Sequence, residues 1–159
     1  MIYILLGSNI GDRAAYLAEA RKRIQEILPT QRVSGIYESA PWGNEQQDSF
    51  LNQVLEADPL ALSPEELLEA CQGIEQAMGR ERKTFWGARN IDIDLLYLGQ
   101  LQYQSPTLQI PHPYIAQRRF TLLPLCELIA DFVHPVLQKT QSRLLEECSD
   151  ALAVWRWAE

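Results

Sequence analysis

Two aspartates at alternate positions, Asp92 and Asp94, form the pattern in this sequence with the clearest chemical meaning. They stand in a run at residues 90–96 whose alternation predicts a strand. Residues two apart in a strand lie about 7 Å apart on the same face, so both carboxylates project together while Ile91 and Ile93 face the core. Such carboxylates repel each other unless a cation lies between them, and Mg2+ prefers carboxylate, water and phosphate oxygens. Spacing alone fits a metal site and two solvated acids on an exposed sheet face equally well.

The segment just before the aspartates is basic, although the chain as a whole is acidic. Residues 80–89 contain the basic residues Arg80, Arg82, Lys83 and Arg89 and a single acid, Glu81. They follow neither the helical nor the strand period, so we expect a loop. The planar guanidinium group of arginine can donate two parallel hydrogen bonds to phosphate oxygens. Arginines beside a pair of carboxylates that can hold a metal ion are typical of sites of phosphoryl transfer. The alternative is a solvated loop paired with surface acids.

The glycine-containing segment at residues 7–12 follows a strand and opens a helix. It has no Lys-Ser/Thr and no GxGxxG spacing, so it is neither a P-loop nor a dinucleotide fingerprint. A tight strand-to-helix turn is the simpler interpretation, and a backbone role near a substrate stays open. A second polar cluster follows Pro111, where His112 could donate to a phosphate or serve the structure alone.

Aromatic side chains gather near the expected loops. They are Trp42, Phe50, Trp86 and Phe120. A flat heteroaromatic ring is held well between such faces, with a neighbouring amide for its polar edge, and Asn52 could supply that amide. Each of these aromatics could equally belong to the core.

The elements that must position these residues follow the order β-α-β-β-α-β. Strands are expected at residues 3–6, 32–39, 50–57 and 90–98, and helices at 13–28 and 64–79. Residues 101–103 could return as a hairpin partner of the strand before them. Helical pattern resumes near Ile115, is bent or broken at Pro124, and returns at residues 142–148. This order predicts an α+β protein with a ferredoxin-like core, in which helices pack on an antiparallel sheet, and a helical C-terminal part.

Length, charge and composition narrow the class of protein further. The chain has 159 residues, which suits one domain over residues 1–159. A net charge of −7 argues against general nucleic-acid binding. No signal peptide or run of 18 or more apolar residues is present, so we expect no membrane partner and a cytoplasmic location. The cysteines, Cys71, Cys126 and Cys148, form no metal spacing and are expected to be reduced.

Taken together, these blocks resemble the 6-hydroxymethyl-7,8-dihydropterin pyrophosphokinase family of folate biosynthesis. The resemblance runs from Leu6 to about Pro135 and is most specific at residues 86–96. Further support comes from residues 37–41, Phe50-Leu51-Asn52, Gln72 with Glu75, Gly79-Arg80, and Pro111-His112-Pro113 with Arg118 and Phe120.

The resemblance implies transfer of pyrophosphate from ATP to the hydroxymethyl group of 6-hydroxymethyl-7,8-dihydropterin by a monomer. Asp92 and Asp94 would bind two Mg2+ ions, and Arg80 and Arg89 would act on the transferring group from a mobile loop. The positions that match ATP contacts are Gln72, Glu75, Arg82, Trp86, Leu95, His112 and Arg118. The positions that match the pterin pocket are Ser39, Pro41, Trp42, Asn52 and Phe120, with Trp42 and Phe120 as stacking walls.

Two positions depart from the family pattern. Phe85 stands where a basic residue is common, in a loop about one residue short, and Phe50 stands where Tyr is common. Two other functions stay open. The first is a nucleotidyl transferase on the same ferredoxin-like core, which would leave the aromatic residues and Asn52 unexplained. The second is a ligand-binding module without catalytic activity.

Overall fold

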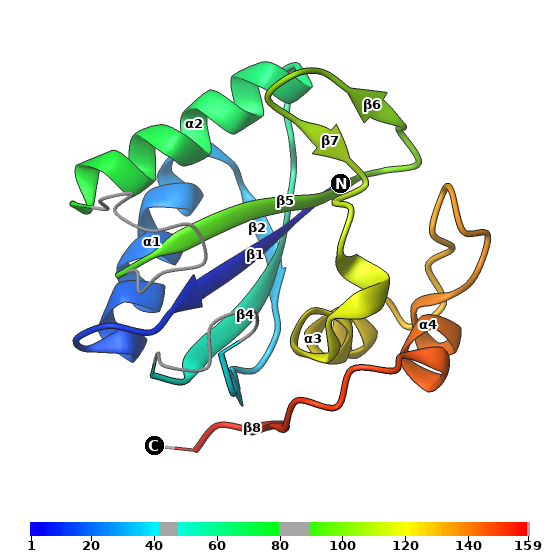
Figure 1. The fold of residues 1–159 in the computed structure, drawn as a ribbon. Coiled ribbons are helices and arrows are strands. Elements are labelled where there is room, and N and C mark those ends of the chain that lie inside the picture. The colour runs from blue at the N-terminus through cyan, green and yellow to red at the C-terminus, as the bar shows by residue number, and fades with distance from the viewer. Residues whose placement is uncertain (42–47, 80–89, 159) are drawn as a thin grey trace.

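The protein is built on one antiparallel sheet with helices on both faces. The computed structural model describes residues 1–41, 48–79 and 90–158. The sheet has the strand order β5-β1-β4-β3-β8, and β2 also pairs with β4 (Figure 1). Its strands are β1 (Ile2–Ser8), β2 (Thr30–Val33), β3 (Tyr37–Ser39), β4 (Phe50–Ala57), β5 (Asp92–Leu98) and β8 (Val154–Arg156). The other elements are α1 (Arg13–Ile27), α2 (Pro64–Ala77), β6 (Tyr103–Gln104), β7 (Gln109–Ile110), the short 3-10 helix η1 (Ile115–Gln117), α3 (Arg119–Ile129) and α4 (Gln141–Glu147).

The ferredoxin-like core is confirmed, because β5 pairs with β1, β1 with β4, and β4 with β2 and β3, all antiparallel. The single strand expected at residues 32–39 is wrong in one respect, since it is divided into β2 and β3. Ser34 causes the break: its hydroxyl accepts the Val54 N–H at 2.9 Å, and its carbonyl accepts the side-chain amide of Gln53 at 2.7 Å. The Ser34 N–H still donates to the Val54 carbonyl at 2.9 Å, and the side-chain bonds take the place of the rest of the ladder between the two short strands.

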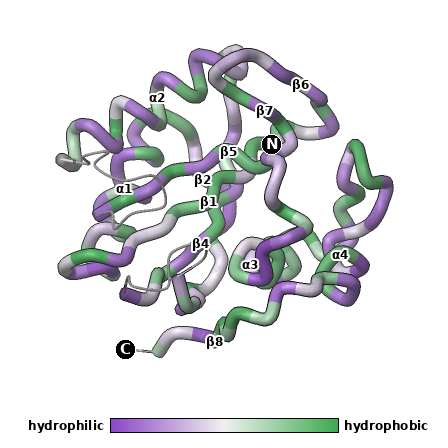
Figure 2. Tube along the Cα trace, in the orientation of Figure 1, coloured by the Kyte–Doolittle hydropathy of each residue, from purple (hydrophilic) through white to green (hydrophobic). Residues whose placement is uncertain are grey.

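Two hydrophobic cores lie on opposite faces of the sheet. Helices α1 and α2 cover one face, where Leu17, Ile24 and Cys71 are buried against β1, β4 and β5. Helices α3 and α4 cover the other face, where Leu122 and Leu144 are buried. The hydrophobic and hydrophilic stretches that alternate along α1 and α2 in Figure 2 are those expected of helices with one buried side. The predicted apolar stripes of both helices are therefore confirmed.

The local signals for helix starts are also confirmed. Asp12 accepts the Ala15 N–H at 3.1 Å, and the preceding Gly11 has φ +66°, which makes the segment a tight turn into α1. At α2, Ser63 and Glu66 form the expected capping box, with bonds of 3.2 and 3.0 Å.

The C-terminal part differs from the sequence prediction in three ways. Helix α3 continues through Pro124, so of the two expectations at that residue, a bend or a break, the break is wrong, since loss of one N–H bond is outweighed by burial of the helix on the sheet. The strand β8, which the sequence did not predict, pairs with β3. Residues 101–103 do not pair with β5; instead β6 pairs with β7, while Gln100 and Gln102 donate to backbone carbonyls of Val133 and Pro135.

No helix in the described ranges is both long and apolar enough to cross a membrane.

Candidate active site

Asp92 and Asp94 lie on one face of β5, the strand at the edge of the sheet. Both are half-buried, whereas Ile91 and Ile93 are buried on the opposite face, as the alternation predicted. The backbone of this strand is fixed from α2, because the Ile93 N–H donates to Glu75 Oε2 at 2.9 Å. Glu75 is 4 % exposed, so it serves as a buried anchor of the strand that carries the aspartates.

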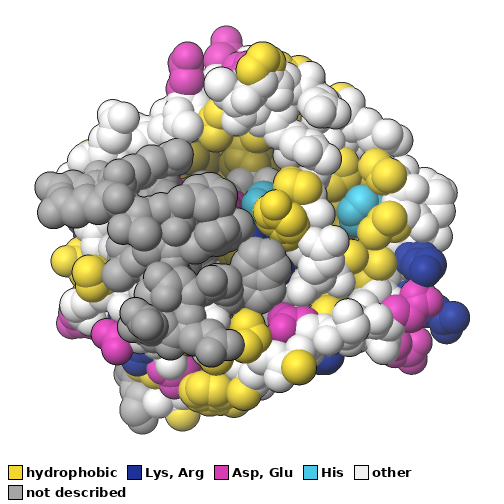
Figure 3. Space-filling view, in the orientation of Figure 1, with side chains coloured by type: hydrophobic (Ala, Val, Ile, Leu, Met, Phe, Trp, Pro, Cys, Tyr) yellow, Lys and Arg dark blue, Asp and Glu magenta, His cyan; other side chains and the backbone are white. Residues whose placement is uncertain are grey.

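A cavity of about 410 Å3 opens beside the aspartates, between α2, β5 and the β6–β7 hairpin. Figure 3 views this face, where the surface is hollowed below the hairpin. The cavity brings together six of the expected site residues: Gln72, Glu75, Asp92, Asp94, Leu95 and His112. All six were expected to contact ATP or its metal, three of them (Gln72, Glu75 and Leu95) by resemblance alone, and their common cavity is large enough for a nucleotide.

The outer wall of this cavity is fastened to α2 by one carboxylate. Glu65, in the first turn of α2, accepts hydroxyl bonds from Tyr103 at 3.0 Å, Ser105 at 2.5 Å and Thr107 at 3.0 Å. The bond from Ser105 is the main cause that lowers the pKa of Glu65. Ser105 and Thr107 line the cavity, so Glu65 holds the hairpin against the helix that supplies Gln72.

His112 presents a neutral N–H donor. Its Nδ1 accepts the Tyr114 N–H at 3.1 Å, which leaves the ring proton on Nε2. Burial lowers the pKa of His112 to about 4, and the nearby positive charge of Arg118 lowers it further, against a smaller opposing effect of Asp92. Arg118 is 5 % exposed, and its guanidinium lies over the rings of Tyr114 at 4.8 Å and Phe120 at 5.5 Å.

A second group of polar and aromatic residues lies across the sheet from the aspartates. The side-chain N–H of Asn52 donates to Ser39 Oγ at 2.9 Å and to the Tyr37 carbonyl at 3.2 Å. Its Oδ1 is directed toward Gly7, 3.8 Å from the place where a Cβ would stand, and Phe50 approaches the same place at 3.6 Å.

The strand register joins the two groups in one row. Gly7 pairs with Asp92 on one side and with Asn52 on the other, so all three share a sheet face. Gly7 is buried and contributes no side chain between the carboxylate of Asp92 and the amide of Asn52. A flat ring over Gly7 would thus have an amide at one edge and the carboxylates at the other.

The structure adds Glu65 to the residues expected from the sequence, and it places Phe50, one of the aromatic candidates, beside Gly7. Phe50 lies two positions before Asn52 in β4, and that spacing was the signal that both side chains share a face. The bonds of Glu65 join segments about 40 residues apart, so no local pattern could indicate them. Pro41 and Phe120 are half-buried. Five expected site residues lie outside the described ranges: Trp42, Arg80, Arg82, Trp86 and Arg89.

A profile of the 7,8-dihydro-6-hydroxymethylpterin-pyrophosphokinase (HPPK) family matches residues 3–130. The chain belongs to this family. It is 39 % identical over 138 residues to the 2-amino-4-hydroxy-6-hydroxymethyldihydropteridine pyrophosphokinase of Aquifex aeolicus, covering 87 % of this chain and 86 % of that one. It is 44 % identical over 134 residues to the enzyme of the same name from Methylorubrum extorquens, covering 82 % and 84 %.

Solved structures show the same fold. A crystal structure of Plasmodium falciparum HPPK-DHPS with pteroate matches with a TM-score of 0.72 at 16 % identity. The match covers 92 % of this chain and 42 % of that longer chain, so this chain spans less than half of it. At this identity the likeness supports the fold alone.

Proposed function

We propose that this HPPK-family pyrophosphokinase transfers the β,γ-diphosphate of ATP to the hydroxymethyl group of 6-hydroxymethyl-7,8-dihydropterin. The observation that carries this proposal is the row Asp92–Gly7–Asn52, in which a carboxylate that lines the cavity shares a sheet face with the amide of Asn52 and the ring of Phe50. The cavity would hold ATP, and the space over Gly7 would hold the pterin ring.

The pterin ring would be recognised by the residues around Asn52. With its N–H group committed to Ser39 and Tyr37, Asn52 has its Oδ1 available to accept from N–H groups at the polar edge of a pterin. Phe50 and Phe120 offer aromatic faces to the ring. This amide and these rings would thus recognise the pterin.

The residues of the cavity fit a hard cation. Asp92 and Asp94 supply carboxylate oxygens, and among the described residues no third histidine, cysteine or acid joins them in a metal-binding group. Mg2+ suits such a sparse set because phosphate and water oxygens complete its shell. When bound there, Mg2+ would neutralise charge on the phosphate oxygens of ATP.

The reaction then needs positioning more than acid–base chemistry. The pterin hydroxyl oxygen forms a bond to the β-phosphorus, the bond from that phosphorus to the α,β-bridging oxygen breaks, AMP leaves and the hydroxyl proton passes to water. Neutral His112 donates its Nε2–H to a phosphate oxygen, a role suited to a group that stays uncharged above pH about 4. Positioning of the two reactants and neutralisation of the phosphate charge would together supply the rate enhancement.

The decisive experiment follows the two phosphate products. Incubation with ATP, Mg2+ and the hydroxymethyl-dihydropterin should release AMP only when the pterin is present, and chelation of the metal should stop it. Release of inorganic pyrophosphate instead of AMP would indicate a nucleotidyl transferase. Pterin binding without AMP would indicate a non-catalytic module. Size-exclusion chromatography tests the expectation of a monomer, and the cytoplasmic location stays a prediction.

A further inference from the structure

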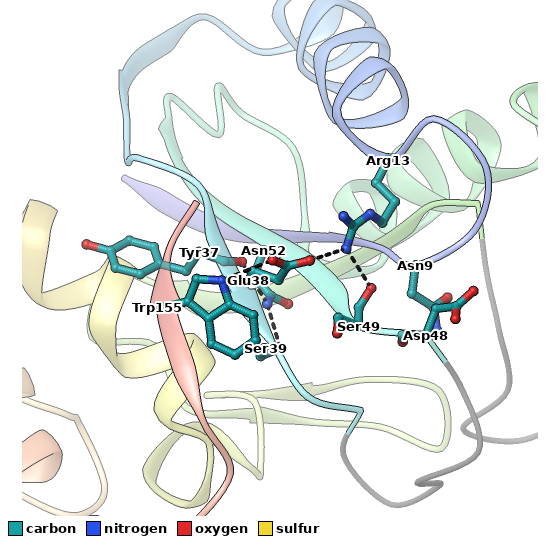
Figure 4. A network of polar contacts seen from close by, with 9 residues as sticks. All are labelled: Asn9, Arg13, Tyr37, Glu38, Ser39, Asp48, Ser49, Asn52 and Trp155. Atoms are coloured by element: carbon teal, nitrogen blue, oxygen red, sulfur yellow. Dashed lines mark hydrogen bonds and ion pairs between the residues drawn. The ribbon is translucent and has the colours of Figure 1, made fainter. Parts of the chain in front are cut away.

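Glu38 is the centre of a clamp behind the pterin-facing residues of β3 and β4. Its Oε2 accepts a bond from Arg13 at 2.6 Å, and its Oε1 accepts the indole N–H of Trp155 at 3.0 Å. Arg13 also donates to the Ser49 carbonyl at 3.0 Å. One carboxylate therefore links the first residue of α1, the strands β3 and β8, and the backbone just before β4, as Figure 4 shows.

The clamp stands where the ladder between β3 and β4 ends. Ser39 and Phe50 are the last paired residues of that ladder, and after Ser39 the chain stays bonded only on the β8 side, where the Ala40 N–H donates to the Ala153 carbonyl at 3.2 Å. Glu38 is directly next to Ser39, and Ser49, which Arg13 holds, is directly next to Phe50. The bonds of Glu38 and Arg13 thus replace the ladder bonds that are missing at this end and fix the separation of Ser39 and Phe50.

A second side chain reinforces the same end. Asn9, in the turn that leads into α1, donates its side-chain N–H to the Asp48 carbonyl at 3.2 Å. Two consecutive carbonyls before β4 are therefore held from this side, that of Asp48 by the turn between β1 and α1 and that of Ser49 by the first residue of α1. That turn follows Gly7, the residue over which the pterin ring is placed.

The clamp acts without touching the ring. Residues alternate between faces along β3, so Glu38 points away from the face that carries Tyr37 and Ser39 and toward α1. Its side chain is 17 % exposed and that of Arg13 is 26 % exposed, so water screens their charge-assisted bonds only in part. Both acceptor oxygens are used, which leaves the carboxylate one orientation.

We infer that Glu38 is a positioning residue for the pterin substrate, acting with Arg13 and Trp155 to set the Ser39–Phe50 wall. This inference rests on the proposed function, since it assumes that the acceptor lies at that wall. It predicts that weakening the clamp raises the KM for the pterin and leaves the KM for ATP unchanged, because Glu65, Gln72 and Glu75 hold the nucleotide cavity independently.

The chain offers a matched control at the other end of the same sheet. Glu56, four residues beyond Asn52 in β4, accepts the Tyr3 hydroxyl at 2.7 Å and Arg32 at 2.8 and 3.1 Å. It is thus also a carboxylate that joins an arginine to an aromatic donor, about 13 Å along the strand from Asn52. Glu56→Gln should lower the thermal stability as Glu38→Gln does, without any change in either KM.

The test is steady-state kinetics of AMP release for Glu38→Gln, Trp155→Phe and Glu56→Gln, with each substrate varied while the other is saturating. In Glu38→Gln the amide N–H faces one of the two donors, so we expect the pterin KM to rise about tenfold, equivalent to about 1.4 kcal/mol. Trp155→Phe removes only the indole bond and should raise it roughly threefold, which keeps the test available if the first variant folds poorly.

Three results overturn the inference: an unchanged pterin KM in Glu38→Gln, an equal rise of both KM values, or the same rise in Glu56→Gln. Each would assign Glu38 a purely structural role. If the wild-type protein releases no AMP with the pterin, the proposed function fails instead, so the two failures are distinguishable.

Discussion

Gly7→Ala should separate the stability of the fold from its capacity to bind a pterin. An alanine Cβ at this position would meet Phe50 at 3.6 Å and Asn52 at 3.8 Å, which are ordinary contacts, and Gly7 does not have positive φ. The folded protein can therefore accept the methyl group without strain. Because alanine restricts the unfolded chain more than glycine does, the free energy of unfolding should stay equal or rise by about 0.4–1 kcal/mol.

Binding of the pterin to Gly7→Ala should weaken, although the fold is as stable as before or more stable. The added methyl fills the space between Asp92 and Asn52 over which the ring is placed, and overfilling a packed space costs about 1–3 kcal/mol. A cost of that size raises the pterin KM roughly 5- to 150-fold. The KM for ATP should change by less than a factor of about two, because the nucleotide cavity does not include Gly7.

The assay pairs thermal unfolding with AMP-release kinetics, and Gly73→Ala is its control. Gly73 is exposed on α2 with nothing within 4 Å of an added Cβ, so alanine there should stabilise the helix by about 0.5–1 kcal/mol and leave both KM values alone. A Gly7→Ala enzyme that is stable and retains the wild-type pterin KM would refute the placement of the ring over this glycine.

Three further predictions concern the nucleotide side. Asp92→Asn and Asp94→Asn should each lower kcat by about 10²- to 10³-fold without loss of the fold; near-wild-type rates at limiting Mg2+ would contradict the metal assignment. Glu65→Ala should raise the KM for ATP roughly 3- to 10-fold, with the pterin KM unchanged, as kinetics of both substrates would show. Since the pKa of His112 falls from 6.5 to about 4 on folding, its neutral form contributes stability that is complete above pH 6.5 and is lost as the pH falls toward 4. Relative to His112→Asn, the wild type should therefore lose about 2–3 kcal/mol over that range in pH-dependent denaturation, and a constant difference would show that the pKa is normal.

Features set by local chemistry could be predicted from the sequence. The alternation of aspartate and isoleucine at residues 91–94 fixed the faces of β5, and Ser63 with Glu66 fixed the start of α2. Both depend on neighbours within three residues, so no tertiary information was needed. The apolar stripes of α1 and α2 could be predicted for the same reason, and so could the ferredoxin-like order of strands and helices.

Features set by distant partners could not be predicted. The division of β2 from β3 depends on Ser34 meeting Val54, and the three-residue strand β8 has no pattern of its own until β3 is beside it. The alignment of Asp92 with Asn52 across Gly7 depends on two strand registers, which the sequence does not state. The sequence therefore indicated residues that the structure brings together in the cavity beside Asp92, and it did not indicate their geometry.

The pairing of β3 with β8 has a consequence for how the protein forms during synthesis. Glu38 and Trp155 are 117 residues apart, so at roughly 5–20 residues per second about 6–23 s separate their appearance from the ribosome. Throughout that interval the outer edge of β3 has no strand beside it, and open edges are the sites where partly folded chains join to one another. Synthesis conditions that slow elongation late in the message should therefore increase aggregation of the nascent chain, and the last strand acts as the cover that ends this exposure.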